Sequence, residues 1–404
     1  MPYRVALVIP EFDVAGGVTG VGLFLRDVLR ETDRYEPDVI SLARGAWDPS
    51  SSQLTAPRTW LCGPQVEERM WSGIPYRHVG ARWSELEFQR HRPRPVLTEL
   101  LQPYDLVQVV AGTPPWAHVA KRVEAPVALQ VATLTHVERD GKQDTETVFR
   151  RYWRSCMSNI VSRMEEEVPS FVDAFFVENT WMYEHLCSQA QESIVHFAPP
   201  GIDTSKFHPP EGEFRRGDYI LSVGRFGDSR KNVPLLFEAY HRLKRCNMDV
   251  PRLVLAGLSG PPESAWDRAE ALGIREDIEM HKNVPEEDLT ELYRNARLFV
   301  LSSNEEGLGL VLAEAMASGT PVVSTDCGGP STLIDDGTTG FLVPTGDAEA
   351  LADRMAHVLA HPKVAKDLGR AGRERVETEF SVEAAGERFL EVYDELMGSR
   401  SVTT

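Results

Sequence analysis

The stretch from Leu301 to Pro330 limits the possible folds more than any other part of the chain. A short β-branched and apolar run, Arg297 to Ser302, precedes a glycine-flanked loop and a series of strong helix formers from Leu308 to Ala317. Gly319 then ends the predicted helix, and Pro321 to Thr325 has the pattern of another buried strand. Strand, loop, helix and strand form the repeating unit of a parallel sheet, so this segment predicts an α/β fold.

Two carboxylates border the predicted helix: Glu306 lies in its entry loop, and Glu314 follows eight residues later. On one ideal helix this spacing is about 12 Å along the axis and roughly 80° around it, too far for a shared proton or a shared metal ion. Gly307 and Gly309 would expose backbone N–H groups at the helix N-terminus, where the dipole favours an anion. Hydroxyl-binding carboxylates on either side of phosphate-binding amides indicate a sugar nucleotide.

This spacing of the two glutamates resembles the donor site of the retaining glycosyltransferases of family 4, the glycosyl transferases group 1. The Gly-Leu-Gly-Leu and Gly-Thr-Pro-Val-Val sequences around them match as well. The resemblance implies an α/β protein of the GT-B architecture, with two Rossmann-like domains facing each other across a cleft. It implies an acceptor-binding domain at residues 1–198, a nucleotide-sugar-binding domain at residues 199–380, and a terminal helix, 381–404, that packs back on the first domain.

The resemblance also assigns roles to residues of this stretch. Glu314 would hold the ribose hydroxyls and Glu306 the donor sugar. The backbone around the diphosphate would come from Gly307, Leu308, Gly309 and Leu310.

Composition narrows the class of protein further. The 404 residues allow about two or three domains. A net charge of −18 argues against a nucleic-acid binder and against strong membrane association. Five scattered cysteines without paired spacing indicate reduced thiols in a cytoplasmic protein. The N-terminal apolar run is too short for a signal sequence, and no stretch is long enough to span a membrane.

The first half repeats the α/β pattern. We predict strands at Tyr3–Ile9, Glu36–Leu42, Asp105–Val110, Val127–Ala132, Asp173–Glu178 and Ile194–Phe197, and helices at Val18–Arg30, Thr145–Glu167 and after Asn179. Gly16 and Gly17 follow the first strand and could bring backbone N–H groups to a phosphate of the donor or to an acceptor. The alternative is a tight turn that needs positive φ. Residues 43–95 are the least regular part, and would form either an acceptor pocket or a variable surface hairpin or loop.

His136 follows the strand 127–132, at the edge where open α/β sheets bind ligands. The resemblance places a histidine here near the donor sugar, which suggests a catalytic role, and a structural hydrogen bond is the alternative. Glu138, Arg139 and Asp140 come next and would reach an acceptor if the loop is short.

The proline-rich segment 198–210 indicates a hinge between domains. After a strand at Tyr219–Val223 comes a glycine loop with three basic residues, Arg225, Arg230 and Lys231, which would supply the positive charge that an acidic chain needs for a diphosphate. The resemblance assigns that role to Arg225 and Lys231. The loop is a residue longer than in many members, so Arg230 is a rival to Lys231, and a solvated basic turn is the alternative for the whole loop.

A helix follows this loop, with Asn232 as its N-cap and Pro234 in its first turn. Further strands are expected at Arg252–Ala256, at Ile278–Lys282 and, at the sheet edge, Gly340–Pro344, and helices at 348–361 after Asp347 and at Ser381–Met397, with Pro362 as a helix breaker. The resemblance places Asn283 and Val284 beside the nucleobase.

The sequence as a whole predicts a retaining hexosyltransferase that moves a sugar from a nucleotide-sugar donor, preferably UDP-linked, to a small-molecule or glycan hydroxyl. No cluster of Asp or His has metal-ligand spacing, so we expect neither metal nor other cofactor. Two alternatives remain. One is a sugar-nucleotide epimerase or a phosphorylase of the same fold, for which there is no clear signature. The other is a non-catalytic sugar-nucleotide sensor, which the intact charge cluster disfavours.

Overall fold

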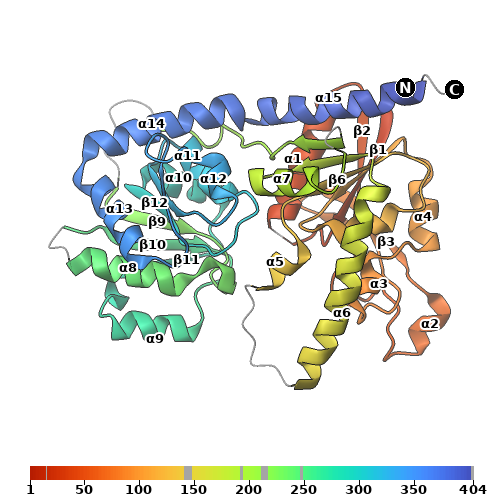
Figure 1. Ribbon diagram of the computed structural model, residues 1–404, viewed down its shortest axis with the longest axis horizontal. Helices are drawn as coiled ribbons and strands as arrows, with labels where there is room; N and C mark the ends of the chain where they lie inside the picture. The colour runs from red at the N-terminus through yellow and green to blue at the C-terminus, as the bar shows by residue number, and fades with distance from the viewer. Residues whose placement is uncertain (15, 141–147, 192–193, 211–216, 246–248, 402–404) are drawn as a thin grey trace. The chain divides into compact units, whose positions relative to one another are not determined.

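The computed structural model describes all residues except 15, 141–147, 192–193, 211–216, 246–248 and 402–404. The described residues form two compact units. The first unit contains the described residues up to Pro200 and those from Ala385 onward, and the second extends from Gly201 to Ala384. Both units are α/β bodies built on a mainly parallel sheet, which confirms the predicted fold class (Figure 1).

The first unit has an eight-stranded sheet in the order β3-β4-β2-β1-β5-β6-β7-β8. All neighbours in it are parallel except β3 and β4, which form an antiparallel hairpin at one edge. The strands are β1 (Tyr3–Pro10), β2 (Tyr35–Leu42), β3 (Val66–Trp71), β4 (Ile74–Val79), β5 (Leu106–Val110), β6 (Val127–Val131), β7 (Ala174–Val177) and β8 (Val195–Phe197).

Helices cover both faces of this sheet. They are α1 (Gly17–Arg30), α2 (Arg58–Cys62), α3 (Glu87–His91), α4 (Pro95–Leu101), α5 (Thr135–Asp140), α6 (Val148–Glu167), α7 (Thr180–Cys187) and the 3₁₀ helices η1 (Pro114–Ala120) and η2 (Val168–Ser170). Alternate residues of β1 point to opposite faces, as strand geometry requires. Ala6 and Val8 pack with α4 and η1, whereas Leu7 and Ile9 pack with α1.

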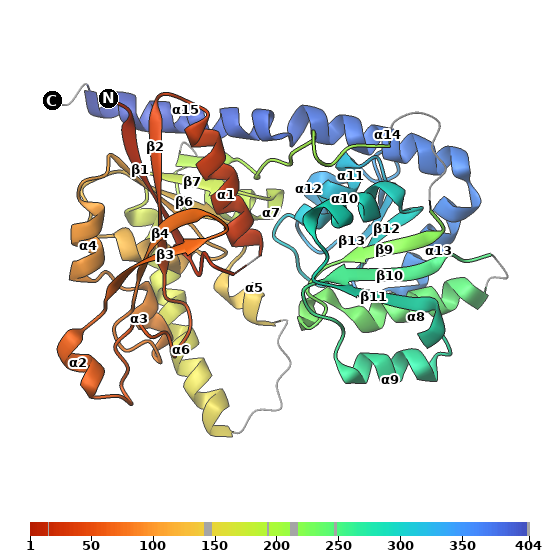
Figure 2. The ribbon, with the colours of Figure 1, turned by 180° about the vertical axis from the view of Figure 1, so that it is seen from behind.

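The last helix, α15 (Val382–Ser401), starts in the second unit and continues into the first. Its Phe389 and Tyr393 are buried against β1 and α1 in the core of the first unit. The Tyr393 hydroxyl also donates a 2.7 Å hydrogen bond to Gln108 Oε1 on β5. Figure 2 shows this blue helix beside β1, β2 and α1. The C-terminal residues are therefore part of the N-terminal sheet's core.

The second unit has six parallel strands in the order β11-β10-β9-β12-β13-β14. They are β9 (Tyr219–Val223), β10 (Arg252–Gly257), β11 (Ile278–Lys282), β12 (Leu298–Leu301), β13 (Val322–Thr325) and β14 (Phe341–Val343). Its helices are η4 (Ser229–Lys231), α8 (Val233–Arg245), α9 (Glu263–Ala271), η5 (Arg275–Asp277), α10 (Glu286–Asn295), α11 (Leu310–Ala317), α12 (Pro330–Leu333), α13 (Ala348–Ala360) and α14 (Pro362–Glu379).

Two separate cores hold this sheet between its helices. On one face α8, α9 and α13 pack on residues such as Ile220 and Val300, and on the other α10, α11 and α12 pack on Leu221 and Phe299. The strand order reverses between β9 and β12, because β10 and β11 lie on one side of β9 and the later strands on the other. Ligands of open α/β sheets bind at the carboxyl ends of strands at such a reversal.

Three features of the structure decide an open alternative or correct the sequence-based expectation. Residues 43–95 contain the β3–β4 hairpin with short helices, so the hairpin alternative holds for part of this region. Residues 135–140 form α5 instead of a loop. Pro362 ends one helix and at the same time starts another, α14, because proline is tolerated in the first turn. Within the described residues, no helix combines the length and the apolar character needed to cross a membrane.

Candidate donor site at the carboxyl edge of the second sheet

The loops that follow β9 and β12 meet at the strand-order reversal of the second unit. The β9 loop can approach the end of β10 because Gly257 has no side chain. A Cβ atom at Gly257 would lie 1.9 Å from the carbonyl oxygen of Gly224. The Gly224 N–H also donates to Ala256 O at 3.0 Å. Glycine at 257 is therefore required by the close approach of two backbones.

The basic residues of the β9 loop have different partners. Arg230 is held by Asp228 at 2.7 Å and by Glu305 at 3.1 Å, and all three side chains are less than one-fifth exposed. Burial would raise the pKa of Asp228, but the hydrogen bonds and charge of Arg230 outweigh it and lower this pKa to about 2. Arg225 is exposed, and its charge also lowers the pKa of Asp228. In this structure Arg230 therefore ties the β9 loop to the β12 loop.

Lys231, the next residue, carries a different contact. Its Nζ lies 2.6 Å from Glu306 Oε1, and the side chains are 16% and 10% exposed. Ser303 Oγ donates to the same carboxylate oxygen at 2.6 Å. Among the described residues, none donates a hydrogen bond to Glu306 Oε2. The pair places a cation at the sheet edge, beside a carboxylate of which one oxygen, Oε1, accepts both hydrogen bonds.

Helix α11 begins beside this pair. Gly309, its N-cap, has φ 91°, in the left-handed region that favours glycine. None of the residues that the structure describes accepts a hydrogen bond from the backbone N–H groups of Leu308, Gly309 and Leu310. The β13 loop packs against the same turn, where a Cβ at Gly329 would lie 2.6 Å from the carbonyl oxygens of both Gly307 and Leu308. The helix N-terminus can therefore offer amide donors to an anion.

Glu314 lies further along α11 and has its own partner. The Tyr293 hydroxyl of α10 donates to Glu314 Oε2 at 2.6 Å. Burial raises the pKa of Glu314 to about 7, although the hydrogen bond from Tyr293 and the charge of Lys206 act in the opposite direction. Glu306 precedes α11 and Glu314 lies within it, so the two residues are not on one helix, as the spacing of about 12 Å had assumed.

The turn after β11 reaches the same edge of the sheet. Asn283 has φ 53°, a left-handed conformation that asparagine tolerates better than most residues. Its N–H donates to Gly257 O at 3.1 Å, so it is linked through Gly257 to the β9 loop. Val284 is partly buried against the α10–α11 core.

The candidate residues of the first unit lie at the carboxyl edge of its own sheet. Gly16 is extended, with φ 172°, and a Cβ at Gly17 would meet no atom within 4 Å. Neither glycine lies in the left-handed region of φ, so the tight-turn alternative, which requires that region, is wrong for both. His136 is exposed in the first turn of α5, and Glu138 lies 3.4 Å from Arg44. The side chains of Arg139 and Asp140 lie outside the described part of the chain.

Cys327 is next to the donor-site loops but is not suited to act as a nucleophile. Burial, followed by the charge of Glu306, raises the pKa of its thiol to about 12. Among the residues that are described, no group of three His, Cys, Asp or Glu side chains could hold a metal ion. The described side chains of this edge supply hydrogen bonds and fixed charge.

Four residues of this site were not predicted from the sequence: Ser303, Glu305, Asp228 and Tyr293. The first three stand within three positions of a predicted residue, so inspection of each loop for partners would have found them. Tyr293 is 21 residues from Glu314 and had no sequence signal.

Comparison with known proteins identifies a family for part of this chain. Residues 203–375 match the family described as Glycosyl transferases group 1. A D-inositol 3-phosphate glycosyltransferase of Saccharomonospora viridis is 31% identical over 58% of this chain and 58% of its own length. A phosphatidyl-myo-inositol mannosyltransferase of Mycobacterium leprae is 27% identical over 98% of each chain. For three other D-inositol 3-phosphate glycosyltransferases the match spans about half of the relative, from 46% to 51%.

Solved structures show the same fold. Sucrose-phosphate synthase of Thermosynechococcus elongatus superimposes with a TM-score of 0.72 and 21% identity, covering 98% of this chain and 100% of that one. HepE of Anabaena, solved with UDP and glucose, has a TM-score of 0.68 and 12% identity over 97% of this chain and 100% of its own. The two parallel-sheet units therefore have the fold of GT-B proteins. Residues 203–375 of this chain form a domain of the Glycosyl transferases group 1 family.

Proposed function

We propose that this protein is a retaining glycosyltransferase that moves a sugar from a nucleotide-sugar donor, UDP-linked by preference, to the hydroxyl of a small molecule or glycan. The observation that carries the proposal is the Lys231–Glu306 pair beside the N-terminus of α11, at the strand-order reversal of a group 1 domain. A cation, a carboxylate and amide donors at one sheet edge suit the diphosphate and the sugar of such a donor.

In this proposal each contact of the second unit acquires a role. Lys231 and Arg225, with the N–H groups of Leu308 to Leu310, stabilise the negative charge that grows on the departing diphosphate. Glu306 binds a donor-sugar hydroxyl through Oε2, while Lys231 and Ser303 hold its other oxygen. Glu314 accepts the ribose hydroxyls. Arg230 supports the loop through Asp228 and Glu305.

The remaining roles rest on the resemblance and on position in the fold. The turn at Asn283 and Val284 contacts the base through backbone groups. Gly16, Gly17 and His136 serve donor and acceptor from the first unit, with Glu138 on the acceptor side.

Retention of configuration without a placed covalent nucleophile points to attack on the face that the diphosphate leaves. In that step the acceptor oxygen bonds to the anomeric carbon, the bond to the diphosphate oxygen breaks, and the diphosphate takes the acceptor's proton. The reaction needs charge stabilisation at the diphosphate, which Arg225 and Lys231 supply without a metal ion. The cysteines among the described residues are unpaired thiols, in keeping with the proposed cytoplasmic setting.

The relatives differ in what their names state. The names of three relatives contain D-inositol 3-phosphate, phosphatidyl-myo-inositol and maltose 1-phosphate. The HepE structures were solved with UDP and with UDP-glucose. We propose UDP as the nucleotide of the donor for this chain. Phosphorylated polyols are the first acceptors to try.

A panel of UDP-, GDP- and dTDP-sugars tests the proposal. We expect a UDP-sugar to raise the thermal unfolding midpoint, since a ligand that binds only the native state stabilises it. The same donor should be consumed when an acceptor is added, with the anomeric configuration retained by NMR. Stabilisation by a GDP-sugar alone would overturn the choice of base. Binding without turnover on any acceptor would favour a sensor.

A further inference from the structure

A strained turn follows the first strand of the N-terminal sheet. Glu11 has φ 57°, a left-handed conformation that is costly for a residue with a Cβ atom. The turn is closed by Val14 N–H, which donates to Glu11 O at 3.2 Å, and Thr19 Oγ1 fixes its end by donating to Val14 O at 2.7 Å. Such strain persists only where the surroundings over-determine the conformation.

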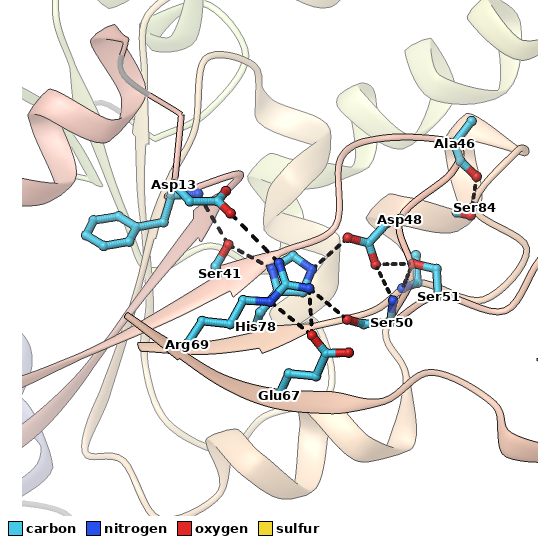
Figure 3. Close-up of polar contacts among 12 residues, drawn as sticks. Asp13, Ser41, Ala46, Asp48, Ser50, Ser51, Glu67, Arg69, His78 and Ser84 are labelled. Atoms are coloured by element: carbon cyan, nitrogen blue, oxygen red, sulfur yellow. Dashed lines mark hydrogen bonds and ion pairs between the residues drawn. The ribbon is translucent and has the colours of Figure 1, made fainter. Parts of the chain in front are cut away.

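A buried chain of hydrogen bonds holds this turn. Phe12 N–H donates to Ser41 Oγ at 3.2 Å, Ser41 Oγ lies 3.1 Å from His78 Nδ1, and His78 Nε2 lies 2.9 Å from Asp48 Oδ2. Ser41 is fully buried and His78 is 2% exposed. The sheet register creates the central contact, because β2 and β4 pair with Ser41 opposite His78. Figure 3 shows the chain from Ser41 through His78 to Asp48.

The carboxylate of Asp48 is the acceptor at the end of this series of hydrogen bonds. Burial acts to raise its pKa, but the hydrogen bond and charge of His78, with Ser51 and Arg69, outweigh it and lower the pKa. Ser50 N–H and Ser51 Oγ also donate to Asp48 Oδ1 at 3.0 Å each. Facing a carboxylate, His78 Nε2 carries a proton and donates to Asp48. When the ring is neutral, Nδ1 accepts from the Ser41 hydroxyl, and Ser41 Oγ accepts from Phe12 N–H in either charge state of the ring.

An aspartate, a histidine and a serine in sequence also form the arrangement of a hydrolase nucleophile. Two observations exclude that role here. Ser41 is fully buried inside the sheet, and its Oγ already accepts the Phe12 N–H. A substrate carbonyl cannot reach this oxygen, so the three residues act on the backbone of the turn.

The hairpin β3–β4 makes a second connection to the same turn. Asp13, next to Phe12, accepts from the Tyr76 hydroxyl at 3.2 Å and lies 3.8 Å from Arg69. Arg69 is itself anchored by Glu67 at 2.7 Å (Figure 3). The hairpin therefore contacts the turn directly at Asp13, and through Ser41 at Phe12.

We propose that His78 is a positioning residue, which sets the ligand-binding conformation of the turn Glu11–Val14 through Ser41. The turn leads to Gly16 and Gly17, where a ligand can reach the backbone because a Cβ at Gly17 would meet nothing. The effect on ligand binding rests on the proposed function, whereas the effect on the turn itself does not. The irregular region 43–95 thus acts on the site through Asp48 and His78.

Substitutions at His78 can separate its contact with Asp48 from its contact with Ser41. In His78→Gln the side-chain amide can still donate to Asp48 but no longer reaches Ser41. In His78→Asn a carbonyl oxygen can replace Nδ1 toward Ser41. Ser41→Ala removes the acceptor of Phe12 directly and serves if the His78 variants do not fold. His118→Gln is the matched control, because His118 is also buried in the first unit and bonds Met164 O at 2.7 Å, on other elements.

Hydrogen exchange of the Phe12 amide is the first readout. We expect His78→Gln and Ser41→Ala to speed its exchange by about tenfold or more, His78→Asn to restore part of the protection, and His118→Gln to leave it unchanged. If the Phe12 amide exchanged at the wild-type rate in both Ser41→Ala and His78→Gln, the proposal would be overturned. Equal acceleration in His118→Gln would also overturn it, since the effect would then be general destabilisation.

Steady-state kinetics with UDP-glucose and GDP-mannose form the second readout. If the competent turn is populated one-tenth of the time, KM for the donor rises about tenfold while kcat stays within about threefold. A fall in kcat at unchanged KM would contradict positioning. If the wild type turns over neither donor, the proposed function loses its support, and the exchange measurement still decides the role of His78.

Discussion

Lys231 and Glu306 are 75 residues apart in the chain, yet Lys231 Nζ lies 2.6 Å from Glu306 Oε1. The contact joins the loop after β9 to the loop after β12, two strands that pair in parallel at the reversal of the strand order. Both side chains are largely buried, so the two loops hold the ammonium and the carboxylate together. In the proposed function this fixed cation would stabilise the charge of a departing diphosphate.

Replacement of Lys231 by alanine should lower kcat by about 10²–10³, because it removes charge stabilisation that grows in the transition state. Arg225→Ala should act in the same direction. Lys244→Ala is the control, since Lys244 pairs with Asp277 at the other end of the same unit. A rise in KM with kcat unchanged would show that Lys231 only binds the donor.

Donor binding should depend on the ionisation of Glu314. Its pKa is raised to about 7, so it is largely protonated at pH 6 and cannot accept both ribose hydroxyls. We expect the Kd for UDP, measured by calorimetry, to fall about tenfold between pH 6 and pH 8. Glu314→Gln should bind UDP more weakly and without this dependence. The same pH dependence in Glu314→Gln would assign it to another group.

Glu178 gives a prediction for stability. It is buried after β7, and burial raises its pKa from 4.5 to about 7, although the 3.2 Å hydrogen bond from Gln130 acts to lower it. The folded state therefore binds a proton that the unfolded state has lost between these values, so stability falls as the pH rises from about 4.5 to 7, by about 3 kcal/mol in all.

Glu178→Gln removes this loss and adds a donor for Gln130 Oε1, a buried atom that has no partner among the described residues. The variant should have a higher unfolding midpoint than the wild type at pH 8 and a similar one near pH 4.5. Exposed Glu68→Gln should leave the pH profile unchanged. Equal midpoints of Glu178→Gln and wild type at pH 8 would refute the assignment.

Gly257→Ala should damage the donor site through the backbone. Its Cβ would lie 1.9 Å from Gly224 O, so the β9 loop must move away from β10. We expect a loss of about 1–3 kcal/mol in stability, as for overpacking, and a loss of donor-induced stabilisation. Gly45→Ala is the control, because a Cβ there meets nothing within 4 Å. Normal donor binding by Gly257→Ala would show that the loop position does not matter.

Turnover should survive treatment with a chelator such as EDTA. The proposed charge stabilisation comes from Arg225 and Lys231, neither of which needs a metal ion. Complete loss that added Mg²⁺ restores would replace this mechanism by metal-assisted departure of the diphosphate.

Local sequence patterns were sufficient for most of the secondary structure. β9 and β11 have the predicted bounds, and Asp347 and Asn179 cap helices through their side chains. Asn232 Oδ1 accepts from Leu235 N–H as a cap does. These features depend on residues within a turn of one another, so neighbouring side chains and backbone decide them.

Contacts between distant segments required the tertiary structure. The two basic residues Arg230 and Lys231 are adjacent in sequence, and only the β12 loop separates their roles by offering Glu305 to one and Glu306 to the other. Likewise Ser41 and His78 meet because β2 pairs with β4 in one register, and a shift by one residue would turn the side chains to opposite faces.

The sequence by itself therefore determined the alternation of strands and helices and the donor-site candidates of the 301–330 stretch, because spacing along the chain encodes them. The tertiary structure decided the strand order, the register and the packing of α15 into the first unit. It thereby decided which charged side chains of the β9 and β12 loops pair, and which contacts hold the turn Glu11–Val14. These depend on side-chain packing between segments tens to hundreds of residues apart, and no local pattern specifies which segments become neighbours.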